Sequence, residues 1–68
     1  MMKKISVYLS GHTTSVSLEP EFADALHKLA AMHNRPVASI ISEIDSRRAP
    51  GTNLSAAVRV WILKQFMG

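Results

Sequence analysis

The sequence predicts an α+β domain, in which an N-terminal strand or hairpin precedes three helices. Polar and apolar side chains alternate over residues 3–18, which is typical of strands with one buried face. Apolar residues then recur every three or four positions in three segments, which is typical of helices. The chain has 68 residues and no cysteine, so a disulfide is excluded and a second copy is the expected source of additional core.

Two short segments predict the strands. Residues 5–9 alternate between aliphatic and polar side chains, and residues 13–18 do the same up to a proline at position 20. In the second segment the side chains of Thr13, Ser15 and Ser17 share one polar face, and those of Val16 and Leu18 share an apolar face. A strand must pair its backbone groups, so this one needs an edge from elsewhere in the chain or from a second copy.

A hairpin through the intervening turn satisfies part of this need. A two-residue loop at Gly11-His12 pairs Val7 with Val16, and a loop at Ser10-Gly11 changes the pairs but not the faces. In both registers the apolar face of one segment continues that of the other, and so do the polar faces. The sequence therefore predicts a hairpin and leaves its register open.

Three helices are expected over residues 20–33, 36–47 and 53–67, and together with the strands they form a single domain over residues 1–68. Pro20 suits a first helical turn, the break at residues 34–36 contains a proline that disfavours helix before it, and Asn53 is a favourable cap. The third helix is apolar on two sides. We therefore expect it to pack between elements or between subunits.

Charge and composition limit the classes of function that the chain can have. The net charge is +3 per chain, and twice that for a dimer, which favours an anionic partner. No apolar run approaches the roughly 20 residues of a membrane span, so a cytoplasmic protein without membrane contact is expected. His27 and His33 lie six positions apart on one helix and do not share ligand spacing, and no phosphate-binding or nucleophile motif is present. We expect no enzyme, no metal site and no cofactor.

Three motifs carry a resemblance to a known family. They are residues 11–22, with Gly-His-Thr-Thr-Ser-Val-Ser-Leu-Glu followed by Pro-Glu-Phe, then Glu43-Ile44-Asp45, and then residues 53–59, Asn-Leu-Ser-Ala-Ala-Val-Arg. With these motifs, and with the helix over residues 22–33, the break at residues 34–39 and the apolar Ile40, Ile41 and Ile44, the chain resembles the ribbon-helix-helix superfamily. This is the fold of the Arc and Met repressors, and within it the chain resembles a small bacterial subfamily. The resemblance implies an intertwined two-fold dimer, in which the strands of two chains pair antiparallel above interlocked helices.

The same resemblance implies a role for particular residues on double-stranded DNA. The ribbon residues Thr13, Ser15 and Ser17 would face the bases in the major groove, which admits a two-stranded β-ribbon. The phosphate contacts would come from Arg35, from Lys4 and from the backbone N–H groups of Val37 and Ala38 at a helix start. The first hypothesis is accordingly a dimeric transcriptional regulator of the repressor type, with assembly beyond the dimer on DNA left open.

A second hypothesis belongs to another class of protein. The ribbon offers only serine and threonine, whose single hydrogen bonds discriminate weakly between bases. On this hypothesis the chain is a protein-interaction or antitoxin-like dimer module that does not read DNA sequence. Its docking surface would consist of the third helix together with Arg47 and Arg48. A partner protein is then expected in place of a specific DNA site.

Overall fold

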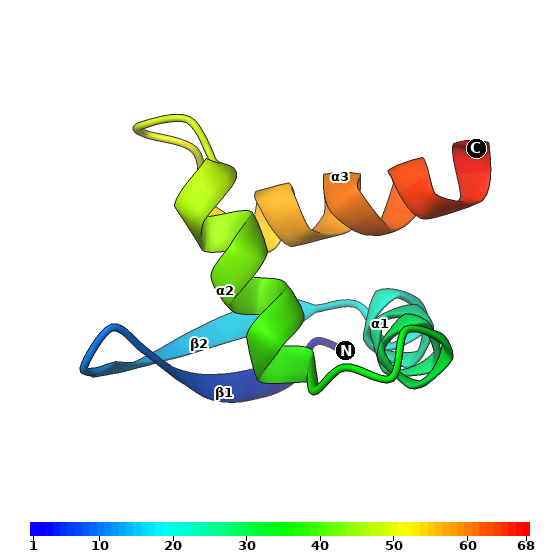
Figure 1. Cartoon of the computed structure of the whole chain (residues 1–68), viewed down its shortest axis with the longest axis horizontal. Coiled ribbons are helices and arrows are strands. Elements are labelled where there is room, and N and C mark those ends of the chain that lie inside the picture. The colour runs from blue at the N-terminus through cyan, green and yellow to red at the C-terminus, as the bar shows by residue number, and fades with distance from the viewer.

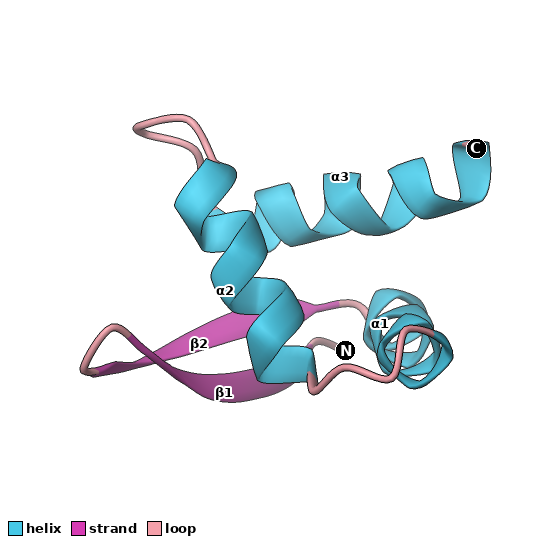
Figure 2. Ribbon diagram, viewed as in Figure 1, coloured by secondary structure: helices cyan, strands magenta, loops and turns pink.

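The computed structural model describes all residues from Met1 to Gly68 and shows a hairpin followed by three helices (Figure 1). The predicted α+β order of elements is confirmed. None of the helices combines the length and apolarity that a membrane crossing requires. The elements are β1 (Lys3–Leu9), β2 (His12–Leu18), α1 (Pro20–Met32), α2 (Val37–Arg47) and α3 (Leu54–Met67) (Figure 2).

The hairpin adopts the second of the two registers that the sequence allows. β1 and β2 pair antiparallel, with Ile5 opposite Val16 and Ser6 opposite Ser15, so the loop consists of Ser10 and Gly11. Both loop residues have positive φ, 48° for Ser10 and 84° for Gly11. Positive φ at both central positions defines the type I′ turn, whose twist matches that of the flanking strands.

The two faces of the hairpin differ as predicted. Alternate side chains point inward and are buried, namely Val7, Leu9, Val16 and Leu18. The side chains between them point outward and are exposed to solvent. The hairpin therefore seals the helices on one side and presents a polar surface on the other.

The turn between α1 and α2 has a specific local cause. Asn34 adopts a left-handed φ of 53°. The Arg35 N–H donates to the Ala30 carbonyl at 2.9 Å, and the Asn34 N–H donates to the Ala31 carbonyl at 3.2 Å. This pair of bonds is a Schellman motif, which satisfies the last carbonyls of α1 and reverses the chain. Pro36 then prevents α1 from continuing and leads directly into α2.

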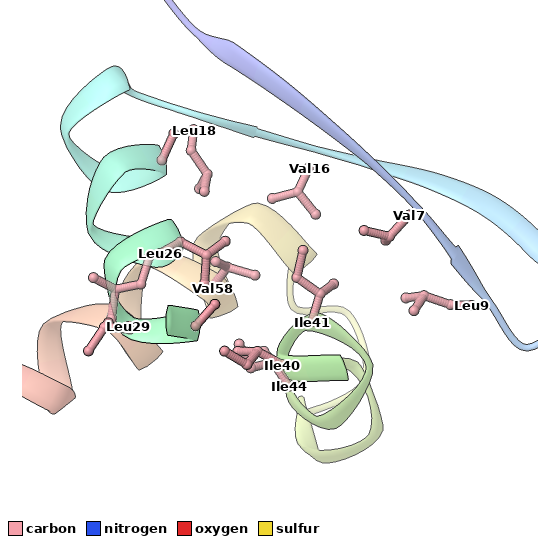
Figure 3. Close-up of a cluster of buried hydrophobic side chains, with 13 residues drawn as sticks. Val7, Leu9, Val16, Leu18, Leu26, Leu29, Ile40, Ile41, Ile44 and Val58 are labelled. Atoms are coloured by element: carbon pink, nitrogen blue, oxygen red, sulfur yellow. The ribbon is translucent and has the colours of Figure 1, made fainter. Parts of the chain in front are cut away.

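A single apolar core lies between the hairpin and the helices (Figure 3). Its 13 buried residues are all hydrophobic, so no polar side chain needs a partner in the interior. α2 packs against β1, α3 packs against β2, and α1 closes the end near Leu18. Val16, Leu18, Leu26 and Ile41 are fully buried. The helical layer thus holds the hairpin with its polar face outward.

Candidate nucleic-acid interface

Six side chains make up the outer face of the hairpin. Because the strands are in register, they form three directly opposed pairs: Lys4 with Ser17, Ser6 with Ser15, and Tyr8 with Thr13. All six residues are exposed, and the tyrosine is 70 % exposed. The structure therefore brings the expected base-facing residues Thr13, Ser15 and Ser17 onto one surface, together with Lys4 from the expected phosphate contacts. Tyr8 and Ser6 extend this surface with two further hydroxyl groups.

One edge of β2 is only partly occupied. The Ser17 N–H donates to the Ser55 hydroxyl of α3 at 3.1 Å, so it points away from β1. In an antiparallel pair the N–H groups of every second residue point to the same side. The N–H groups of Thr13 and Ser15 must then also face this outer edge, and no hydrogen bond within the chain uses them. β2 consequently offers donors and acceptors to another strand.

The start of α2 leaves two backbone donors without a carbonyl partner. Pro36 is the cap residue and provides no side-chain hydrogen bond, while its carbonyl accepts from the N–H groups of Ser39 and Ile40 at 3.0 and 3.3 Å. The N–H groups of Val37 and Ala38 precede these and have no acceptor in the chain. The positive end of the helix dipole lies at the same place. This arrangement suits an anion such as a phosphate.

Arg35 lies beside the same helix start, but its side chain is already engaged. Its guanidinium donates to the Ser39 hydroxyl at 3.0 Å and to the Ser39 carbonyl at 3.1 Å, and it forms an ion pair with Glu43 at 3.2 Å. A phosphate would have to displace the Glu43 carboxylate. Since half-exposed ion pairs contribute at most about 1 kcal/mol, such an exchange is energetically small.

A contact that the sequence does not indicate joins the strand–helix junction to α3. Arg59 donates from Nε to the Glu19 carboxylate at 2.9 Å. The hydrogen bond from the Glu19 backbone N–H and the bond from Arg59 hold the pKa of this carboxyl below its usual value of 4.5. The pair fixes α3 next to the end of β2 and so positions Ser55 at the strand edge.

No group of three or more histidine, cysteine, aspartate or glutamate side chains is arranged to hold a metal ion. His33, at the end of α1, lies beside Trp61 of α3 with 6.5 Å between the ring centroids. It takes part in packing between helices and not in a cluster of ligands.

A family model described as a ribbon-helix-helix domain matches residues 2–66 of the chain. The chain therefore belongs to the ribbon-helix-helix domain family, as the motifs in its ribbon predict. Domains of this family are typically DNA-binding and typically act as dimers. Comparisons with curated proteins and with solved structures gave no match.

Proposed function

We propose that this protein is a bacterial transcriptional regulator, of the repressor type, that binds double-stranded DNA as a homodimer in the cytoplasm. The observation that carries the proposal is the exposed polar face of the hairpin, which is joined without a loop to a helical core in a chain of a DNA-binding family. The charge of +3 per chain supports an anionic partner.

The open edge of β2 supports the dimer. Two copies of β2 related by a two-fold axis can pair antiparallel through the backbone groups of Thr13 and Ser15, which have no partner within the chain. The product is a sheet in the order β1, β2, β2 of the second copy, β1 of the second copy. Its polar face is continuous, because strand pairing keeps alternate side chains on the same side.

The width of that sheet determines which strand can contact the bases and which can contact the phosphates. Neighbouring strands lie about 4.8 Å apart, so the outer strands of a four-stranded sheet lie about 14 Å apart. The major groove is about 12 Å wide, so only the two central strands fit inside it. Thr13, Ser15 and Ser17 on β2 would then face the bases, and Lys4 on β1 would lie over a phosphate backbone.

The start of α2 would supply further phosphate contacts through the N–H groups of Val37 and Ala38. Arg35 would join them by exchanging Glu43 for a phosphate, because its ion pair is half-exposed and weak. Contacts of this kind fix the orientation of the protein on DNA without reading sequence.

A second candidate function is a protein-interaction dimer that has lost base-specific reading. It is favoured by the chemistry of the outer face, where the expected base-facing residues are serine and threonine only. The two candidates differ in one measurable way: only the regulator prefers particular DNA sequences over random DNA at equal salt concentration.

The first experiment is an anisotropy titration with labelled DNA over a series of salt concentrations. We expect binding that weakens linearly on a log–log plot. Replacing Ser15 with glutamate should abolish binding without changing the mass of the dimer, because a carboxylate would face the bases. Ser42→Glu, on the exposed side of α2, is the matched control and should bind almost as the natural protein does. If the natural protein fails to bind DNA even at low salt, the regulator proposal is wrong.

A further inference from the structure

α3 carries an apolar stripe that the fold leaves uncovered. Val58 and Ile62 of this helix are buried in the core. On another side, Val60, Leu63 and Met67 are 51 %, 54 % and 74 % exposed. They are spaced by three and four residues and therefore form one line along the helix. Single exposed apolar side chains are ordinary on a protein surface, but an aligned row of three marks a face that can be covered.

The stripe borders a groove between α3 and the second half of α2. The groove has a volume of about 450 Å³, which lies within the usual range for binding sites in proteins. Its apolar lining comes from Ile44 on α2 and from Ala56, Ala57, Val60 and Trp61 on α3. Val60 belongs to both the groove and the stripe, so the two form one continuous apolar surface. No residue of the hairpin contributes to it.

The charges around the groove are mostly positive. Three cationic side chains, Arg47, Arg48 and Lys64, line it together with one carboxylate, that of Glu43. The Glu43 carboxylate is paired with Arg35, which lies outside the groove, and Arg48 is paired with Asp45. Arg47 on the α2 wall and Lys64 on the α3 wall form no ion pair. The groove thus offers two exposed cations on opposite walls of an apolar floor.

A second copy of this chain does not complement such a groove. Three of its five carboxylates are held in ion pairs, and the other two, Glu21 and Asp24, lie on α1. The apolar side of α1 is already used in the core. The α3 of a second copy would bring Arg59 and Lys64, which would place further positive charge beside Arg47.

We propose that the groove between α2 and α3 binds an acidic amphipathic helix of another protein. Apolar side chains of that helix would cover Trp61 and the stripe from Val60 to Met67, and flanking carboxylates would pair with Arg47 and Lys64. Because the groove uses none of the hairpin residues, a helix bound there would not cover the outer face of the hairpin. A partner could therefore be held while the outer face of the hairpin contacts DNA.

Trp61 allows a direct test, because it is the only tryptophan in the chain and it lines the groove. The full chain would be titrated with a synthetic amphipathic helical peptide that carries glutamates beside a leucine stripe. The matched peptide has lysine in place of each glutamate. We expect a saturable blue shift of the Trp61 emission with the acidic peptide, and at least tenfold weaker binding of the basic one.

Variants of the protein distinguish the contribution of charge to peptide binding from the contribution of apolar contact. Arg47→Glu combined with Lys64→Glu should lower the affinity for the acidic peptide at least tenfold. The same double variant should bind the basic peptide more tightly than the natural protein does. Lys28→Glu, an equal charge reversal on the exposed side of α1, should leave both affinities unchanged. Far-ultraviolet circular dichroism checks the fold of each variant, and Arg47→Ala with Lys64→Ala repeats the test without introducing new charge.

Two results would overturn the inference. The first is a response of Trp61 that is equal for both peptides or unaffected by the changes at Arg47 and Lys64. The second is a Trp61 emission that depends on protein concentration without any peptide, together with a smaller solution mass for Leu63→Glu. That second result would mean that another copy of the chain covers α3. Neither readout involves DNA, so failure here leaves the regulator proposal to its own titration.

Discussion

Glu19 performs a task that differs from the one its position suggests. It precedes a proline-started helix, where a carboxylate is expected to interact with the positive end of the helix dipole. Its side chain makes no capping hydrogen bond and instead accepts from Arg59, which lies 40 residues further along the chain. The residue therefore connects the end of β2 to α3, while its own backbone N–H also donates to the carboxylate.

The lowered pKa of Glu19, which is caused by its backbone N–H and by Arg59, predicts a pH dependence of stability. Because the pKa of Glu19 is lowered in the folded chain, its contribution is complete above the unperturbed value of 4.5 and is lost as the pH falls through the lower folded value. Glu19→Gln should therefore reduce the free energy of unfolding at neutral pH, and the difference from the natural protein should vanish in acid. Urea unfolding at a series of pH values measures this.

Glu21→Gln serves as the control, because Glu21 lies two residues away, is exposed and forms no ion pair. Its effect should be smaller than that of Glu19→Gln at neutral pH. A difference between Glu19→Gln and the natural protein that persists unchanged at low pH would contradict the role of the carboxylate charge.

At the scale of elements, residue patterns along the chain predict where the strands and helices lie. Alternation predicts both strands, and the spacing of apolar residues, Pro36 and Asn53 predict the helices nearly to their ends. The register of the hairpin was left open because both loops preserve the faces. In the structure the loop consists of Ser10 and Gly11, so Ser10 adopts a positive φ that serine seldom adopts and that its residue type does not predict.

The candidate interface was predictable only in part, for a related reason. The shared face of Thr13, Ser15 and Ser17 follows from the strand period. The engagement of Arg35 by Glu43 and the bond from Ser17 to Ser55 depend on where helices meet other elements. Such contacts join residues from different elements, and no pattern in the sequence relates one of these residues to the other. The groove beside Trp61 likewise exists only once α2 and α3 are placed together.

The two edges of the hairpin provide a prediction about the dimer. Ser15 and Ser6 are directly opposed, and the N–H of each points away from the other strand. Proline at either position removes a donor without breaking a bond of the hairpin. Ser15→Pro should prevent pairing between two copies of β2 and lower the solution mass to that of a monomer, whereas Ser6→Pro should retain the dimer. Sedimentation or light scattering distinguishes them.

Ser6→Pro is a closely matched control, because both changes constrain φ in the same hairpin. If Ser6→Pro dissociates the protein and Ser15→Pro does not, the copies pair through β1. The order of strands in the proposed sheet would then have to be reversed.

The whole molecule divides its surface between two kinds of chemistry. The outer face of the hairpin is polar and carries hydroxyl groups with one lysine per chain, whereas the groove between α2 and α3 is apolar with a positive rim. The core between them holds 13 residues and no polar side chain, which is small for an independent domain. The proposed dimer through β2 would add shared structure at one edge, and both surfaces would remain accessible.

The salt dependence of DNA binding tests this arrangement of the whole dimer. Each phosphate contact contributes about 0.9 to the slope of the logarithm of the binding constant against the logarithm of salt concentration. A two-fold dimer places Lys4 on both outer strands of the sheet, so Lys4→Ala should make the slope shallower by about 2. Lys28→Ala removes the same charge from the exposed side of α1 and should leave the slope nearly unchanged. Equal slopes for Lys4→Ala and Lys28→Ala would mean that net charge alone governs binding, whereas a change of about 1 would mean that a single hairpin contacts the DNA.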